Sequence, residues 1–213
     1  MTRLQLAIDL VPLADLEAVV TPLLPYIDMV EAGTPLIKRH GMEVVRTLRR
    51  LAPDHLIVAD MKAMDAGGLE AEIAFEAGAD IMTVLAGASD ATITAAVTVA
   101  RAGGRAVVAD LIGVADKVAR ASQVAGLGIS YIGIHTGTDD QASGMDPLAD
   151  LAAISRAVEI ETAVAGGINA TSLPAILALQ PAIAIVGSGI LGQPDPVAAA
   201  KALRNLIDRG RPA

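Results

Sequence analysis

Short apolar runs and alanine-rich amphipathic stretches alternate along the chain, and this pattern predicts its secondary structure. Eight short runs rich in β-branched side chains are typical of strands. The predicted strands are Leu4–Asp9, Ile27–Glu31, Leu56–Asp60, Ile81–Leu85, Ala106–Leu111, Tyr131–His135, Thr162–Ala165 and Ala182–Val186. The stretches between them carry helical periodicity. The predicted helices are Asp15–Leu24, Met42–Leu51, Leu69–Ala77, Thr92–Ala102, Ala115–Gly126, Pro147–Val158, Ser172–Leu179 and Pro196–Arg209.

The regular alternation of strands and helices indicates a parallel sheet, because parallel strands need a crossover connection that is usually a helix. Eight such units with right-handed crossovers predict a closed (β/α)8 barrel, the TIM barrel of the α/β class. The alternative is an open Rossmann-like sheet, but no Gly-x-Gly-x-x-Gly segment follows the first strand. No linker or low-complexity tract interrupts residues 1–213, so we expect a single barrel domain with short loops.

Composition narrows the classes of function. Apolar residues make up 53% of the chain and charged residues 19%, which is typical of a globular protein. A net charge of −8 and few aromatic residues argue against nucleic acid as a partner. Without cysteine the chain has no disulfide, thiolate zinc site or cysteine nucleophile. No signal-peptide pattern follows Met1, and no apolar run approaches the roughly 18 residues of a membrane span. We therefore expect a cytoplasmic protein without membrane contact.

Polar side chains follow most of the predicted strands, at the edge where a barrel of this class carries its reactive groups. These strand ends supply Asp9, Glu31, Asp60 with Lys62, Asp110 and His135. Helix capping explains one such residue about as well as a functional role does. It does not explain a set that places acids, an amine and an imidazole on one rim.

Asp60, Lys62 and Asp65 fall within six residues at the end of the third predicted strand. Two acids and an amine are costly to crowd together unless they pair, bind a metal or take part in chemistry. One interpretation is an ion pair, with Asp65 as the N-cap of a helix that begins near Gly67. The other is catalysis, and the residues at the remaining strand ends favour it.

Glu31 and Asp60 end neighbouring strands, so their carboxylates could bind one divalent cation. Oxygen ligands, without cysteine and with few histidines, favour a hard ion such as Mg²⁺ over zinc. The competing interpretation is an ion pair between Glu31 and Lys62, and both can hold if the pair forms in the metal-free state.

His135 is the best candidate for a general acid or base, since an imidazole titrates near neutral pH. The alternative is a hydrogen-bonded structural histidine. Two glycine clusters follow the last two predicted strands, where barrel enzymes often bind phosphate through backbone N–H groups. Their key residues are Gly166, Gly167, Gly187 and Ser188. Each cluster alone could be a tight turn, whereas the pair predicts a phosphate site.

These motifs together resemble the 3-hexulose-6-phosphate synthases, in the orotidine monophosphate decarboxylase suprafamily of barrels. The resemblance covers nearly the whole chain. The pattern Asp60-x-Lys62-x-x-Asp65 marks the suprafamily. The segments Glu31-Ala32-Gly33-Thr34-Pro35-Leu36 and His135-Thr136-Gly137-Thr138-Asp139 are more specific.

The resemblance implies a Mg²⁺-dependent lyase that condenses D-ribulose 5-phosphate with formaldehyde in an aldol reaction. It also implies a homodimer in which Asp65 reaches the active site of the partner subunit. Our mechanistic hypothesis is that His135 removes a proton beside the ketone and that Mg²⁺ and Lys62 stabilise the enediolate. Asp9 and Asp65 would orient Lys62 and keep it charged.

Two other functions stay open at this point. 3-Keto-L-gulonate 6-phosphate decarboxylases share the same acidic, lysine and histidine positions, but they usually carry an arginine where this chain has Asp139. That difference favours the synthase, and the resemblance implies that Asp139 is a substrate-binding residue. Ala63 replaces a threonine that is common in the synthases. The chain could also be a non-catalytic phosphosugar-binding barrel, although its Asp60, Lys62 and Asp65 set is complete.

Overall fold

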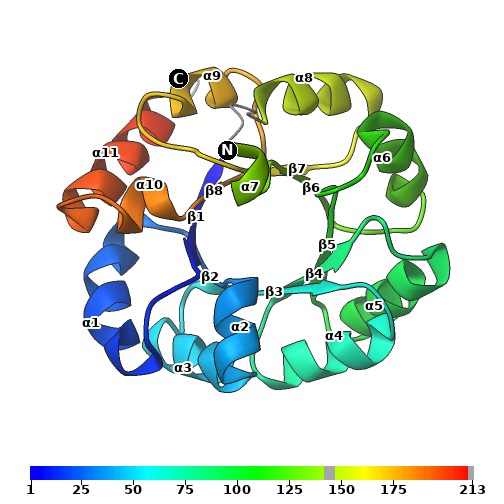
Figure 1. Cartoon of the computed structure of the whole chain (residues 1–213), viewed down its shortest axis with the longest axis horizontal. Coiled ribbons are helices and arrows are strands. Elements are labelled where there is room, and N and C mark those ends of the chain that lie inside the picture. The colour runs from blue at the N-terminus through cyan, green and yellow to red at the C-terminus, as the bar shows by residue number, and fades with distance from the viewer. Residues whose placement is uncertain (142–146, 211–213) are drawn as a thin grey trace.

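Eight parallel strands close into a barrel in the computed structural model, which describes residues 1–141 and 147–210 (Figure 1). Each strand pairs with the next in sequence, and β8 pairs with β1 to close the ring. The strands are β1 (Arg3–Ile8), β2 (Met29–Ala32), β3 (Leu56–Ala63), β4 (Ile81–Leu85), β5 (Ala106–Asp110), β6 (Tyr131–His135), β7 (Thr162–Ala165) and β8 (Ile183–Val186). The predicted TIM barrel is confirmed.

Helices surround the ring of strands (Figure 1). The α-helices are α1 (Leu16–Val20), α2 (Thr34–His40), α3 (Glu43–Leu51), α4 (Gly67–Glu76), α5 (Asp90–Ala102), α6 (Lys117–Ala125), α7 (Thr138–Gln141), α8 (Leu148–Ala157), α9 (Leu173–Leu177), α10 (Ser188–Leu191) and α11 (Pro196–Arg209). Ser89, Asp116 and Asp195 cap α5, α6 and α11, because each side chain accepts a backbone N–H of the first turn. In the described part of the chain, no helix is long and apolar enough to cross a membrane.

The first predicted helix, Asp15–Leu24, is wrong as a single element. The chain forms a 3₁₀ turn η1 (Leu13–Asp15), the short α1 and a second 3₁₀ segment η2 (Thr21–Tyr26). Pro22 and Pro25 lie in η2 and cannot donate the backbone hydrogen bonds of an α-helix. The short helices α2, α7 and α10 were not predicted, because so few residues carry no periodic signal.

Alternation along the strands separates two apolar layers. In β1, Leu4, Leu6 and Ile8 are fully buried against the helices, whereas Gln5 and Ala7 line the interior of the barrel. The outer layer is the main core. A smaller cluster of buried side chains fills the barrel below its C-terminal rim; it comprises Met29, Val58, Ile81, Val108, Ala163 and Ile183. This inner layer forms a closed floor, so the polar residues above it face one cavity.

β3 is irregular where it reaches the rim. It runs three residues beyond the predicted end at Asp60, and its register with β4 shifts between Ala59 and Ala63. Lys62 lies in this irregular stretch and has a left-handed backbone with φ of 48°. A side chain in that region is uncommon and clusters at functional sites.

Candidate active site

A cavity of about 340 Å³ opens at the C-terminal end of the barrel, and every strand contributes to its wall. Nine of the predicted site residues line it: Asp9, Glu31, Asp60, Lys62, His135, Gly166, Gly167, Gly187 and Ser188. The predicted convergence of acids, an amine and an imidazole on one rim is therefore confirmed.

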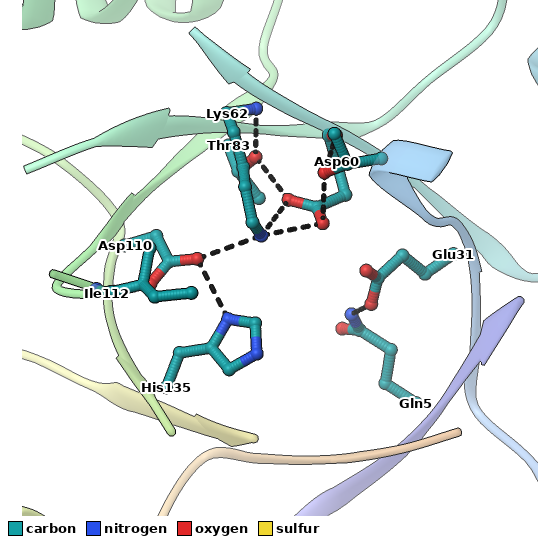
Figure 2. A network of polar contacts seen from close by, with 9 residues as sticks. Gln5, Glu31, Asp60, Lys62, Thr83, Asp110, Ile112 and His135 are labelled. Atoms are coloured by element: carbon teal, nitrogen blue, oxygen red, sulfur yellow. Dashed lines mark hydrogen bonds and ion pairs between the residues drawn. The ribbon is translucent and has the colours of Figure 1, made fainter. Parts of the chain in front are cut away.

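Lys62 connects two carboxylates inside the cavity (Figure 2). Its Nζ lies 2.8 Å and 3.0 Å from the two carboxylate oxygens of Asp60, and 3.1 Å from Oδ2 of Asp110. The same Asp110 oxygen lies 3.1 Å from Nδ1 of His135. One carboxylate thus joins the lysine to the histidine, and the four side chains form a continuous polar chain across β3, β5 and β6.

The charges in this chain support one another. Burial alone would lower the pKa of Lys62, but the neighbouring charges of Asp60 and Asp110 outweigh it and raise that pKa above its ordinary value. Burial favours protonation of Asp110, yet the hydrogen bond from His135 and the charge of Lys62 lower its pKa below the ordinary value. Lys62 is therefore an ammonium and Asp110 a carboxylate at neutral pH.

The ionised state of Asp110 determines which nitrogen of His135 carries a proton. An ionised carboxylate only accepts hydrogen bonds, so Nδ1 of His135 must donate to it. In the neutral imidazole the proton then resides on Nδ1, and Nε2 is left with a free lone pair. The imidazole ring points into the central space of the site (Figure 2), so Nε2 can take a proton from a bound molecule.

Glu31 is the second acid predicted to bind a metal, and it is only 7% exposed. Its carboxylate accepts a hydrogen bond of 2.5 Å from Nε2 of Gln5. Burial, and then repulsion by Asp60, raise the pKa of Glu31 to about 8. The alternative pairing with Lys62 is absent from the ion pairs of the described residues, in which Lys62 pairs with Asp60 and Asp110.

The acids at this rim fit a hard cation. Asp60 raises the pKa of Glu31 because two negative charges face the same space, and a cation between them would remove that repulsion. Within residues 1–141 and 147–210, no three histidine, aspartate or glutamate side chains form a preformed metal cluster. Mg²⁺ does not require one, since it usually binds one or two carboxylates and completes its shell with water and substrate.

The glycine clusters form the wall of the cavity that lies across the barrel from Asp60 and Lys62. Gly166 and Gly167 both have a left-handed backbone, with φ of 121° and 63°. A Cβ on Gly166 would lie 2.8 Å from Thr136, so a side chain at this position would be strained and would clash. Gly187 and Ser188 follow β8 and line the same wall.

Asp9 lies in the cavity against Gly33. A Cβ on Gly33 would lie 2.1 Å from Oδ1 of Asp9, so glycine is required there for the carboxylate to keep its place. Burial, and then the charge of Asp60, raise the pKa of Asp9. Asp9 is not the partner of Lys62, whose hydrogen bonds go to Asp60 and Asp110.

Two predicted residues lie outside the cavity of a single chain. Asp65 is exposed, and its carboxylate accepts the N–H of Ala66. Helix α4 has Ala66 as its N-cap, with no side-chain cap, so the interpretation of Asp65 as that cap is wrong. Asp139 is exposed on α7, and its neighbour Thr138 lines the cavity instead. The expected place of Asp65 in the active site of a partner subunit stays a prediction.

Four polar residues of the site had no predicted role: Asp110, which was named as a strand end, and Gln5, Thr34 and Thr83. Gln5 holds Glu31, whereas the hydroxyls of Thr34 and Thr83 donate to Asp60 over 2.8 Å and 2.6 Å. A polar side chain facing into the barrel from an otherwise apolar strand is the signal that could have found Gln5 and Thr83.

Comparisons with known proteins agree with this geometry. Residues 2–203 match the model of the orotidine 5'-phosphate decarboxylase / HUMPS family. A 3-hexulose-6-phosphate synthase of Mycobacterium gastri is 42% identical and covers 96% of this chain and 99% of its own length. A crystal structure of a 3-hexulose-6-phosphate synthase is 44% identical, with a TM-score of 0.93 over 97% of this chain and 100% of that one. The 3-keto-L-gulonate-6-phosphate decarboxylase of Vibrio cholerae is 33% identical, with a TM-score of 0.88 over 99% of both chains.

Proposed function

The chain belongs to the orotidine 5'-phosphate decarboxylase / HUMPS family, and we propose that it is a lyase with 3-hexulose-6-phosphate synthase activity. The reaction would join formaldehyde to D-ribulose 5-phosphate and form a new carbon–carbon bond. The observation that carries this proposal is the polar chain from Lys62 through Asp110 to His135, which combines a fixed ammonium with a base.

Each residue of the polar chain has its own role in the proposed reaction. Nε2 of His135 takes a proton from the hydroxymethyl carbon beside the ketone, and Asp110 stabilises the imidazolium that forms. Lys62 stabilises the enediolate oxygen, where negative charge develops. The enediolate carbon then attacks the carbon of formaldehyde, and the proton held by His135 is available to the new alkoxide. The base is thereby restored.

Mg²⁺ is the proposed cofactor, with Glu31 and Asp60 as its protein ligands. When bound, it would act as a Lewis acid toward the sugar oxygens. Gln5 orients Glu31, and the hydroxyls of Thr34 and Thr83 orient Asp60. These contacts leave each carboxylate fixed toward the cavity (Figure 2).

The phosphate of the sugar would bind at the wall formed by Gly166, Gly167, Gly187 and Ser188. Backbone N–H groups can approach an anion there because the glycines carry no Cβ. This wall follows β7 and β8, across the ring from Asp60 and Lys62 on β3. Asp9 borders it, since a Cβ on Gly187 would lie 4.0 Å from Oδ2 of Asp9.

A homodimer with shared active sites is the proposed assembly. Asp65 lies beside exposed apolar side chains on the β3–α4 segment, with Met64 56%, Leu69 59% and Ile73 39% exposed. Such a patch is typical of a protein interface. If Asp65 completes the site of the partner subunit, mixing inactive Asp65→Ala and Lys62→Ala proteins should restore activity, because each hybrid dimer has one intact site. Absence of any recovery in a proven hybrid would contradict the sharing.

A coupled assay tests the proposed reaction directly. Consumption of formaldehyde should require ribulose 5-phosphate and should stop in EDTA. His135→Asn should abolish exchange of the proton beside the ketone with solvent, and retained exchange would exclude His135 as the base. His40→Asn is the matched control, because His40 ends α2 and does not line the cavity, so its turnover should be unchanged.

The decarboxylase is the second enzymatic candidate, and one observation weighs against it. Its substrate carries an additional carboxylate, yet Lys62 is the only lysine or arginine among the described residues that line the cavity. Formaldehyde is neutral and needs no second cation. Asp139 lies outside the described cavity lining, so the preference for the synthase drawn from position 139 stays a prediction. A non-catalytic binding barrel would show ligand binding without turnover of either substrate.

A further inference from the structure

Thr83 occupies an unusual place opposite the irregular end of β3. The register pairs Ala59 with Met82 and Ala63 with Val84. Three residues of β3 therefore face the single residue Thr83 of β4. Such a bulge interrupts the ladder of backbone hydrogen bonds and re-aims side chains.

The hydroxyl of Thr83 replaces the contacts that the bulge removes. Its Oγ1 accepts the backbone N–H of Lys62 over 2.9 Å and donates to Oδ1 of Asp60 over 2.6 Å (Figure 2). Thr83 is only 8% exposed, so water cannot easily take over either role. One buried hydroxyl thus connects the left-handed backbone of Lys62 to the carboxylate that pairs with its ammonium.

We propose that Thr83 is a positioning residue that holds Asp60 and Lys62 in their reactive arrangement. The kinetic part of this inference rests on the proposed function, whereas the structural part does not. Without the hydroxyl, the amide of Lys62 has no partner and the carboxylate of Asp60 loses its shortest hydrogen bond. Lys62 acts on charge that develops during the reaction, so its displacement should lower kcat more than it raises KM for the sugar phosphate.

Thr83→Val is the principal test, because valine keeps the β-branched shape that suits a strand and replaces the hydroxyl by a methyl group that cannot form hydrogen bonds. We expect kcat to fall by roughly 10- to 100-fold, as for other losses of catalytic alignment, with KM changed less than about threefold. Thr83→Ser restores the hydroxyl and should recover most of kcat. Thr83→Ala also lacks the hydroxyl and replaces Thr83→Val in the test if the valine variant does not fold.

Thr2→Val is the matched control. Thr2 is also buried, and its hydroxyl donates to the carbonyl of Pro181 over 2.7 Å at the opposite end of the barrel. This variant also loses a buried hydrogen bond, so its thermal stability should fall while its kcat stays unchanged. A general loss of stability is thereby separated from loss of alignment.

Hydrogen exchange at the amide of Lys62 is a readout that does not depend on activity. Exchange should accelerate in Thr83→Val and stay slow in Thr83→Ser and Thr2→Val. Unchanged exchange in Thr83→Val overturns the proposal, as does faster exchange with kcat within about threefold of wild type. If wild-type protein consumes no formaldehyde, the proposed function fails, and exchange at Lys62 still decides whether Thr83 holds the bulge.

Discussion

Replacing Glu31 by glutamine should stabilise the metal-free protein at alkaline pH. Glu31 is buried, and its pKa rises from 4.5 to about 8 because of burial and the charge of Asp60. Below pH 4.5 this residue is protonated in both the folded and the unfolded state, so it contributes no pH dependence. Between the two pKa values the folded state holds a proton that the unfolded state has lost. Stability therefore falls as pH rises through this window, and the loss is complete above about pH 8.

The magnitude follows from the separation of the two pKa values. About 3.5 pH units, at about 1.4 kcal/mol each, give an upper bound of about 5 kcal/mol. Relaxation around the charged carboxylate and entry of water reduce this figure, so we expect a gain of about 1–3 kcal/mol for Glu31→Gln at pH 8.5. Glutamine keeps the shape of the side chain and can still accept the hydrogen bond from Gln5.

Urea unfolding in EDTA at pH 5 and pH 8.5 measures this effect, since chelation removes any metal that would stabilise the carboxylate. The two proteins should differ little at pH 5, and the variant should be more stable at pH 8.5. Glu17→Gln on the exposed surface of α1 is the control, and it should show no such pH-dependent gain. A variant that is less stable than wild type at pH 8.5, or equally shifted at both pH values, would refute the reasoning.

Three further predictions concern the same cavity. Gly33→Ala should lower activity by at least about tenfold, because the new Cβ would lie 2.1 Å from the carboxylate of Asp9; steady-state kinetics beside thermal unfolding will separate this from misfolding. Asp110→Asn should lower kcat by about 10²- to 10⁴-fold, since a neutral amide can neither stabilise the imidazolium of His135 nor balance the charge of Lys62. A smaller loss would mean that Asp110 does not assist His135 as the base. Chelation of metal should abolish turnover and lower the melting temperature at pH 8.5, and added Mg²⁺ should restore both. Full activity in EDTA would exclude the proposed cofactor.

The barrel was predictable because its strands are short apolar runs with polar ends. The predicted bounds of β4, β6 and β7 are those observed, since apolar side chains and junction residues define them locally. β3 was predicted to end at Asp60 but continues to Ala63. Its last residues form a bulge that depends on Thr83 of the neighbouring strand, and no local pattern in β3 contains that information.

The members of the candidate site were predictable because they lie at the ends of these strands. In a parallel barrel the strand order alone brings the C-terminal ends of all strands to one rim, so Asp9, Glu31, Asp60, Lys62 and His135 had to share a cavity. Which of them touch is a different matter, because contacts depend on side-chain directions across strands. The sequence therefore indicated the members of the site, whereas the partners of Lys62 required the structure.

Protonation depends on those partners, and this explains why the acids of one rim differ in state. Asp110 stays ionised because His135 and Lys62 both donate to it, which overcomes the effect of its burial. Among the described residues, Glu31 has only the amide of Gln5 as a hydrogen-bond donor and faces Asp60, so burial raises its pKa. A carboxylate that lacks a cationic partner in an otherwise satisfied network is the group with most to gain from a bound cation. The contrast between these two acids supports the proposals that a metal binds beside Glu31 and that Asp110 acts with the base.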